Sequence, residues 1–336
     1  MKPSPNPSRA ERRWPLRFLW VLLCSALVVS LFLNCAAWGI ASSETSDNPE
    51  DEFPDLSETA SYGTDGPKVV RIPLQGTIAH EGAESFFGVA SDPVESLLRQ
   101  IRAASNDEEV RGILLEVDSP GGGVTASDEI YHELLQFKAA ATNRAIVGLA
   151  QDMAASGAYY VLMAADAIVA QPTAMIGSIG VIISGVNASG LAERFGVRDA
   201  TVASGPNKDL LNPLKPVDEQ HVAILRAAVD ADYERFLSLV AKGRGKTADE
   251  LRPLCDGRVL SAAAALEAGL VDAIGYREDA LALLASKLGD TEVRAVKYEE
   301  SKSFLDNLFS VRSPVAPVLS RLGLGTPSRR EYRWAP

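Results

Sequence analysis

The sequence predicts an α/β fold built on a largely parallel sheet. Short apolar or β-branched runs alternate with stretches of helical periodicity along the middle of the chain, as in folds where helices connect parallel strands. The runs are almost wholly apolar, which is typical of strands buried on both faces. The chain of 336 residues has room for one such domain, which we place at residues 67–290.

The expected elements follow one another in a regular order. Strands are expected at 69–74, 112–117, 145–150, 167–170 and 181–184. Helices of crossover length are expected at 92–104, 125–138 and 157–165. Beyond residue 216 the strand signal fades, and a helical C-terminal half is expected from the stretches 217–242, 261–268 and 277–288.

The N-terminal region has the pattern of a membrane anchor. Residues 18–40 carry no charge, and 23 helical residues can cross a hydrocarbon core of roughly 30 Å. Residues 1–17 are basic, whereas the segment after the apolar run is acidic, so we expect the N-terminus in the cytoplasm and the domain outside. A cleaved signal peptide is the alternative, although its apolar region is usually shorter. Lipidation of Cys35 is disfavoured by the bulky Asn34 before it.

Two flanking segments are expected to lie outside the fold. Residues 41–66 are rich in Ser, Asp, Glu, Pro and Gly, which predicts a disordered acidic linker. Residues 291–336 contain several prolines and a late basic cluster, which predicts a loosely ordered tail.

Several classes of function find no support in the residues. The net charge of −11 argues against a nucleic-acid partner. The three histidines, His80, His132 and His221, lie in a loop or on charged stretches, where a surface role is expected. No metal-ligand spacing, Gly-x-Ser-x-Gly elbow or phosphate-binding glycine loop is present, so we expect no metal and no cofactor.

Two segments have the composition of a catalytic site. In the segment DSPGGG at 118–123, three glycines after an expected strand present bare amides that can stabilise an oxyanion, although a plain strand-to-helix turn is the interpretation that the glycines alone favour. In MAASGAYY at 153–160, Ser156 lies among small residues at the start of an expected helix. Ser156 is a candidate nucleophile, and a simple helix N-cap is the alternative.

A serine nucleophile needs a base, and a lysine kept neutral by an apolar environment can serve where no histidine is suitable. Lys208 lies in SGPNKDLLNP at 204–213, a turn-rich loop that leads into apolar residues. On the residues alone, a surface lysine is the favoured interpretation.

Together, these segments resemble the signal peptide peptidase A family, whose members use a Ser/Lys dyad on a fold similar to Clp protease and crotonase. The resemblance covers residues 68–287 and also includes the turn IGSIGV at 176–181, KGRG at 242–245 and DGRV at 256–259. It implies a repeated β-β-α superhelix with Ser156 as nucleophile and Lys208 as general base. It further implies that Ser178 orients the lysine and that amides of Gly122 and Gly123 line the oxyanion hole. Ala158 and Asp152 depart from the family pattern. The change at Ala158 bears on the shape of the substrate pocket, and the change at Asp152 bears on its rim.

The resemblance also implies partners and substrates. A single copy of the domain matches the short form of the family, whose members form homo-oligomeric rings, in this case an octamer, in which a neighbour helps to complete each site. The implied substrates are remnant signal peptides and other apolar or unfolded peptides outside the cell membrane, in a periplasm if there are two membranes. Alternatives are a crotonase-like acyl-CoA hydratase or thioesterase, an inactive membrane scaffold, or a peptidase of membrane proteins.

Overall fold

The computed structural model describes residues 20, 22–32, 56–80, 84–85, 88–89, 92–299 and 331–333. The chain divides into two units, Met1–Glu52 and Phe53–Pro336. In the first unit, residues 22–32 are helical and expose apolar side chains such as Leu27 and Phe32. Within the described part of the chain, no helix has both the length and the apolarity to cross a membrane. Of the expected anchor at 18–40, residues 18, 19, 21 and 33–40 lie outside the described residues.

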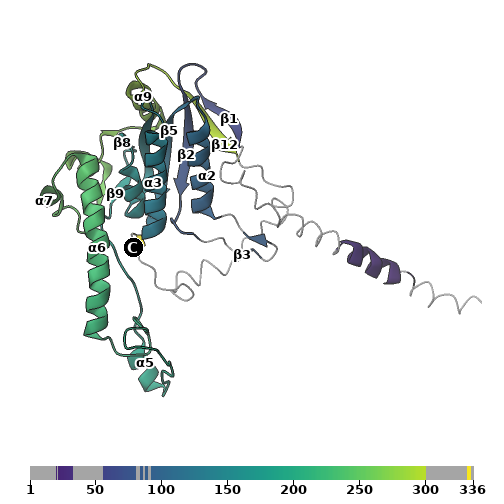
Figure 1. Cartoon of the computed structure of the whole chain (residues 1–336), viewed down its shortest axis with the longest axis vertical. Coiled ribbons are helices and arrows are strands. Elements are labelled where there is room, and N and C mark those ends of the chain that lie inside the picture. Colours follow the sequence, from purple (N-terminus) through teal and green to yellow (C-terminus); the bar gives the residue numbers. More distant parts are fainter. Residues whose placement is uncertain are drawn as a thin grey trace, which may run out of the picture. The chain divides into compact units, whose positions relative to one another are not determined.

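The second unit contains a mixed α/β domain around a central sheet of nine strands (Figure 1). Seven strands form its main path, in the order β1-β12-β2-β5-β7-β8-β11. Their bounds are Ser57–Tyr62 (β1), Arg294–Glu299 (β12), Lys68–Gln75 (β2), Val110–Ser119 (β5), Ala145–Ala155 (β7), Ala167–Ala170 (β8) and Ala273–Ile274 (β11). Only β1 pairs antiparallel on this path, so the expectation of a largely parallel sheet is confirmed.

Short strands lie near the ends of the central ones. Met175–Gly177 (β9) pairs parallel with the end of β7 and antiparallel with Val259–Ser261 (β10). Gly121–Gly123 (β6) follows β5 and pairs antiparallel with Glu331–Arg333 (β13), while Glu84–Ser85 (β3) pairs with Gly88–Val89 (β4). The sequence did not predict β13, because it is only three residues long and lies within a Pro-rich segment.

Helices cover both faces of the sheet. Their bounds are Pro93–Asn106 (α2), Val124–Ala139 (α3), Gly157–Leu162 (α4), Ser189–Arg194 (α5), Glu219–Arg244 (α6), Ala248–Leu251 (α7), Ala262–Glu267 (α8) and Arg277–Lys287 (α9). One core cluster joins the sheet to α2, α3, α4 and part of α6, and a second, centred on Leu114 and Leu284, joins the other face to α9. Alternate side chains of one strand, such as Ile113 and Leu114, enter different clusters, because strand side chains alternate between faces.

One expected strand is wrong. Residues 181–184 form no strand, and β9 forms earlier, at Met175–Gly177. Ser178 follows β9 with φ of 50°, a left-handed conformation that turns the chain out of the sheet before the apolar run begins. Ile182 is accordingly exposed.

A buried ionic cluster attaches α9 to the sheet. Arg71 on β2 donates to both carboxylate oxygens of Glu116 on β5, at 2.9 and 3.0 Å. Arg277, the first residue of α9, donates to the same carboxylate at 2.5 Å. Arg71 and Glu116 are each 5% exposed, so the two cations offset most of the cost of burying the Glu116 charge.

Candidate active site

Ser156 occupies a strained turn between β7 and α4. Its φ of 55° and ψ of −120° lie outside the regions that non-glycine residues favour, at a cost of roughly 1–3 kcal/mol. The turn is held by the Ser156 N–H, which donates to the Gly177 carbonyl at 2.7 Å. Ser156 has the N-cap position of α4, but its side chain makes no capping hydrogen bond. Helix capping therefore does not account for this serine.

The Ser156 hydroxyl is buried and unpaired. The residue is 1% exposed, and its Oγ has no hydrogen-bond partner among the residues that the structure describes. A buried hydroxyl without a partner is uncommon, because it loses its bonds to water and gains none in return. The combination of backbone strain and an unpaired hydroxyl is typical of a reactive group.

Ser178 lies beside Ser156 because of strand register. β7 and β9 run parallel with Ala155 opposite Gly177, and the next residue on each strand is one of the two serines. Ser178 is 5% exposed, and its N–H donates to the Arg258 carbonyl at 2.7 Å. Main-chain bonds thus hold two adjacent buried serines, both at positive φ.

The glycine segment DSPGGG forms a short strand next to the loop that follows β2. Gly121 has φ of 92°, and its N–H donates to Ser119 Oγ at 3.1 Å. Ile78 accepts from the Gly123 N–H at 2.7 Å and donates to the Gly121 carbonyl at 2.9 Å. A Cβ on Gly122 would lie 2.0 Å from the Ile78 carbonyl oxygen, so only glycine fits there.

These contacts bear on the two expected oxyanion donors. The Gly123 N–H is engaged by Ile78 and is not available to a ligand in this conformation. Gly122 stays a candidate, and β6 contacts α4, which begins directly after Ser156. The glycine segment therefore borders the nucleophile turn.

The edge of β6 binds an extended segment of backbone. β13 pairs antiparallel with it, with Tyr332 opposite Gly122. An exposed strand edge offers main-chain donors and acceptors that any extended peptide can use.

Lys208 is separate from this site in the single chain. It lies in the connection between α5 and α6 and is exposed. Its side chain makes no hydrogen bond or ion pair with the described residues, and the unpaired Oγ of Ser156 excludes a bond between the two. The apolar pocket expected around this lysine is therefore not formed by one chain alone.

The region around Lys208 exposes apolar side chains instead. Figure 1 shows α6 extending beyond the sheet, and its N-terminal half contains no buried residue. Phe195 is 74% exposed and Val202 is 97% exposed. Further exposed apolar residues nearby are Val186, Leu191, Val197 and Val217. These exposed apolar side chains all belong to the segment between Val186 and Val217 that contains Lys208.

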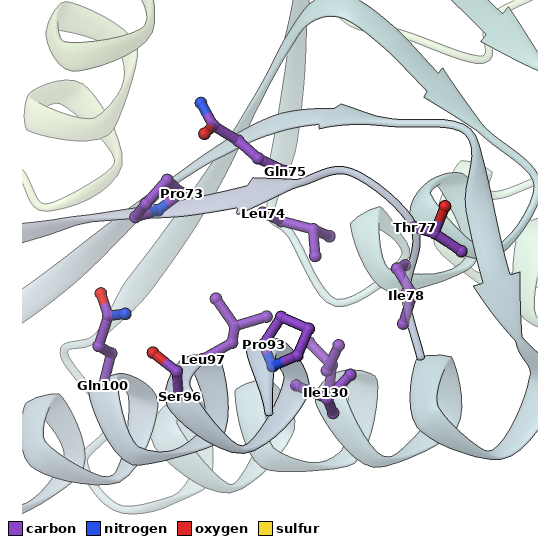
Figure 2. A pocket seen from close by; sticks show the side chains of 11 residues that line it. Pro73, Leu74, Gln75, Thr77, Ile78, Pro93, Ser96, Leu97, Gln100 and Ile130 are labelled. Carbon is purple, nitrogen blue, oxygen red and sulfur yellow. The ribbon is translucent and has the colours of Figure 1, made fainter. Parts of the chain in front are cut away.

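A pocket of about 270 Å³ lies between the end of β2 and the helices α2 and α3 (Figure 2). Apolar side chains that line it include Leu74, Ile78, Leu97 and Ile130, and polar ones include Gln100. Ile78 connects this pocket to the glycine segment.

The histidines lie elsewhere in the described part of the chain. His80 contacts Asp92 at 2.8 Å through Nδ1 and Glu129 at 2.6 Å through Nε2. Burial lowers the pKa of His80, but the hydrogen bonds and charges of the two carboxylates outweigh it and raise the pKa above 6.5. His221 bonds the Pro206 carbonyl at 2.9 Å. No metal-binding group of His, Cys, Asp and Glu occurs among the described residues.

Sequence analysis missed a polar junction one turn beyond the nucleophile. Tyr160 on α4 donates to Asp128 on α3 at 2.5 Å, and Arg235 on α6 donates to both, at 3.0 Å to the Tyr160 hydroxyl and 2.6 Å to Asp128. Burial raises the pKa of Asp128, but the bonds from Tyr160 and Arg235 outweigh it and lower the pKa. Charged residues at helical spacing resemble a solvated face, so this junction could not be recognised from the residues alone.

Comparisons with known proteins show the family of the chain. The model for peptidase family S49 matches residues 138–290, and the model for Clp protease matches residues 88–179. The chain is 38% identical to the protein "Putative signal peptide peptidase SppA" of Enterococcus faecium over 242 residues, which cover 72% of this chain and 70% of that one. The chain belongs to the signal peptide peptidase A family.

Two further relatives are longer than this chain. The chain is 32% identical over 228 residues to Protease 4 of Salmonella typhi, covering 67% of this chain and 36% of that protein. It is also 32% identical over 197 residues to the chloroplastic serine protease SPPA of Arabidopsis thaliana, covering 57% of this chain and 28% of that protein.

Proposed function

We propose that the chain is a membrane-anchored serine endopeptidase that uses a Ser/Lys dyad on a Clp protease/crotonase-like superhelix. The observation that carries the proposal is the unpaired, buried hydroxyl of Ser156 in a strained turn next to Ser178 and the glycine segment. Membership of a peptidase family supports peptide hydrolysis over the acyl-CoA reactions that the related crotonase fold also performs.

In this proposal, Lys208 reaches Ser156 from a neighbouring copy of the chain. A lysine acts as a base only in its neutral form, and removal from water favours that form. The exposed apolar residues around Lys208 supply a surface that would bury it on docking. A ring of copies, an octamer by family resemblance, would give each Ser156 the lysine of its neighbour.

The chemical steps then follow the logic of an acyl-enzyme. Lys208 accepts the proton of Ser156 as its Oγ attacks the peptide carbonyl, and Ser178 orients the amine. The Gly122 amide stabilises the oxyanion, and the amine returns the proton to the leaving nitrogen. Water activated by the same lysine hydrolyses the acyl-enzyme.

The proposed substrates are remnant signal peptides and other apolar or unfolded peptides. An extended segment already pairs with the β6 edge, which supports binding of a strand-like substrate. The pocket next to Ile78 is suited to an aliphatic side chain. Residues 18–40 would anchor the chain with its N-terminus in the cytoplasm, placing the domain where membrane-embedded peptides emerge.

The test is hydrolysis of an apolar peptide by the full chain in detergent. Ser156→Ala and Lys208→Arg should each abolish turnover, because arginine keeps the charge of lysine but cannot be deprotonated in a protein. Lys287→Ala removes another exposed lysine and should retain wild-type turnover of the peptide. Turnover retained in either dyad variant would refute the mechanism, and an inactive wild type would favour the scaffold. Hydrolysis of an acyl-CoA thioester but no peptide would favour a crotonase-like enzyme.

A further inference from the structure

The junction of Tyr160, Asp128 and Arg235 connects the three segments that the proposed reaction uses. Tyr160 lies one turn after the nucleophile, and its N–H donates to the Ser156 carbonyl at 2.9 Å. Asp128 lies in α3, which begins directly after the glycine segment. Arg235 lies in α6, the helix that follows the loop bearing Lys208. The helices that follow the nucleophile turn, the glycine segment and the Lys208 loop therefore each contribute one side chain to this junction.

Among the described residues, α6 packs against the domain core from Val229 to its C-terminal end. Its buried residues are Phe236, Leu237 and Val240, and the aromatic rings of Phe236 and Tyr160 lie 5.2 Å apart. Apolar packing has little directional preference, so the polar contacts of α6 set its rotation. Tyr233 and Arg244 bond to the segments around Cys255 and Gly269, whereas Arg235 bonds to α3 and α4 beside the nucleophile turn. The guanidinium of Arg235 has donors in a fixed plane, and it uses Nε for Tyr160 and Nη2 for Asp128.

The first turn of α6 contacts the segment that carries Lys208. His221 bonds the carbonyl of Pro206, two residues before the lysine. His221 lies about 21 Å along the helix from Arg235, at a rise of about 1.5 Å per residue. A tilt of about 3° at Arg235 would therefore move the base segment by about 1 Å, a displacement that can lower a catalytic rate about 100-fold.

We propose that Arg235 is a positioning residue that sets the direction of α6 and thereby places the Lys208 segment for the Ser156 of a neighbouring copy. This inference rests on the proposed function and adds a residue to it. Arg235 is about half exposed, so its contribution to overall stability is small compared with its effect on orientation.

The test compares Arg235→Met with Arg252→Met in the full chain. Arg252 pairs with Glu234, the residue next to Arg235 on α6, at 2.6 Å, so its loss removes an ion pair from the same helix without touching Tyr160 or Asp128. We expect Arg235→Met to lower kcat about 10- to 100-fold with KM within about twofold, and Arg252→Met to change neither. Arg235→Lys, which keeps the charge and a donor, should recover part of the loss.

A second readout does not depend on activity. Hydrogen–deuterium exchange of residues 204–222 should be faster in Arg235→Met than in wild type, while exchange in β7 stays the same. An unchanged kcat, or equal exchange in residues 204–222, would overturn the inference even if the wild type is active. If Arg235→Met is poorly folded, the same two measurements on Arg235→Lys decide. An inactive wild type would reject the proposed function, and the exchange result would still decide whether Arg235 orients the segment.

Discussion

Two inactive variants should restore activity when they assemble together. If Ser156 of one copy works with Lys208 of the next, a Ser156→Ala copy still offers its lysine and a Lys208→Ala copy still offers its serine. A site at their contact therefore has both intact groups, although each variant alone has none. This expectation depends on the unpaired Ser156 and the exposed Lys208 of the single chain.

The expected activity follows from counting contacts around a ring. With equal amounts of the two variants mixed at random, a site needs its serine from one kind of copy and its lysine from the other. Each condition holds for half of the copies, so about one quarter of the wild-type activity should return. The recovered activity should be highest at equal amounts and fall on either side.

The assay is peptide hydrolysis by oligomers obtained from co-expression of the two variants. Mass spectrometry of the intact oligomers would show that both kinds of copy are present in one particle. If mixed particles form and remain inactive at every ratio, the two groups belong to one copy, and the proposed contribution of a neighbour is wrong.

Three further outcomes follow from the described contacts. Gly122→Ala should lower kcat at least about 100-fold, because the new Cβ would lie 2.0 Å from the Ile78 carbonyl oxygen. In Gly123→Ala the same distance is 3.6 Å, so the decrease in kcat should be far smaller. Equal kcat values for the two variants would contradict this explanation. Glu116→Gln should reduce the free energy of unfolding, measured in urea, by about 3 kcal/mol, because Arg71 and Arg277 lose their shared anion. Glu109→Gln removes the exposed pair with Arg294 and should change this free energy by less than about 1 kcal/mol. Because the pKa of His80 is raised on folding, its pairing stabilises the protein fully below pH 6.5, and the benefit is lost as pH rises through the higher folded value. The urea midpoint of wild type relative to His80→Gln should therefore decline over that range, and a difference that grows with pH would refute the pairing.

Continuously apolar strands and long helices could be predicted from sequence, whereas the largely polar strands β1 and β12 and the shortest strands could not. The run 167–170 coincides with β8, and the stretch 217–242 nearly coincides with α6, because continuous burial or helical periodicity leaves a strong pattern. β9 has only three residues, too few for a period, so the neighbouring run at 181–184 was mistaken for the strand.

The candidate site was predictable in composition but not in geometry. Small residues around Ser156 and the glycines at 121–123 indicated close backbone approach, and the structure brings these segments together. Ser178 came from family resemblance alone, because its position depends on the register of β9 against β7. Lys208 is exposed in the structure, so the apolar environment expected around it is not seen, and its role as the base stays a prediction.

The pairing of β7 with β9 has a consequence for how this sequence can vary. Main-chain hydrogen bonds set the positions of Ser156 and Ser178, and these bonds are the same for almost any side chain. Substitutions at partly exposed strand positions such as Met175 can therefore accumulate without moving the two serines. A single inserted residue in either strand would instead put the wrong side chain next to the nucleophile. Over evolutionary time, this part of the domain should tolerate extensive replacement but very few changes in length.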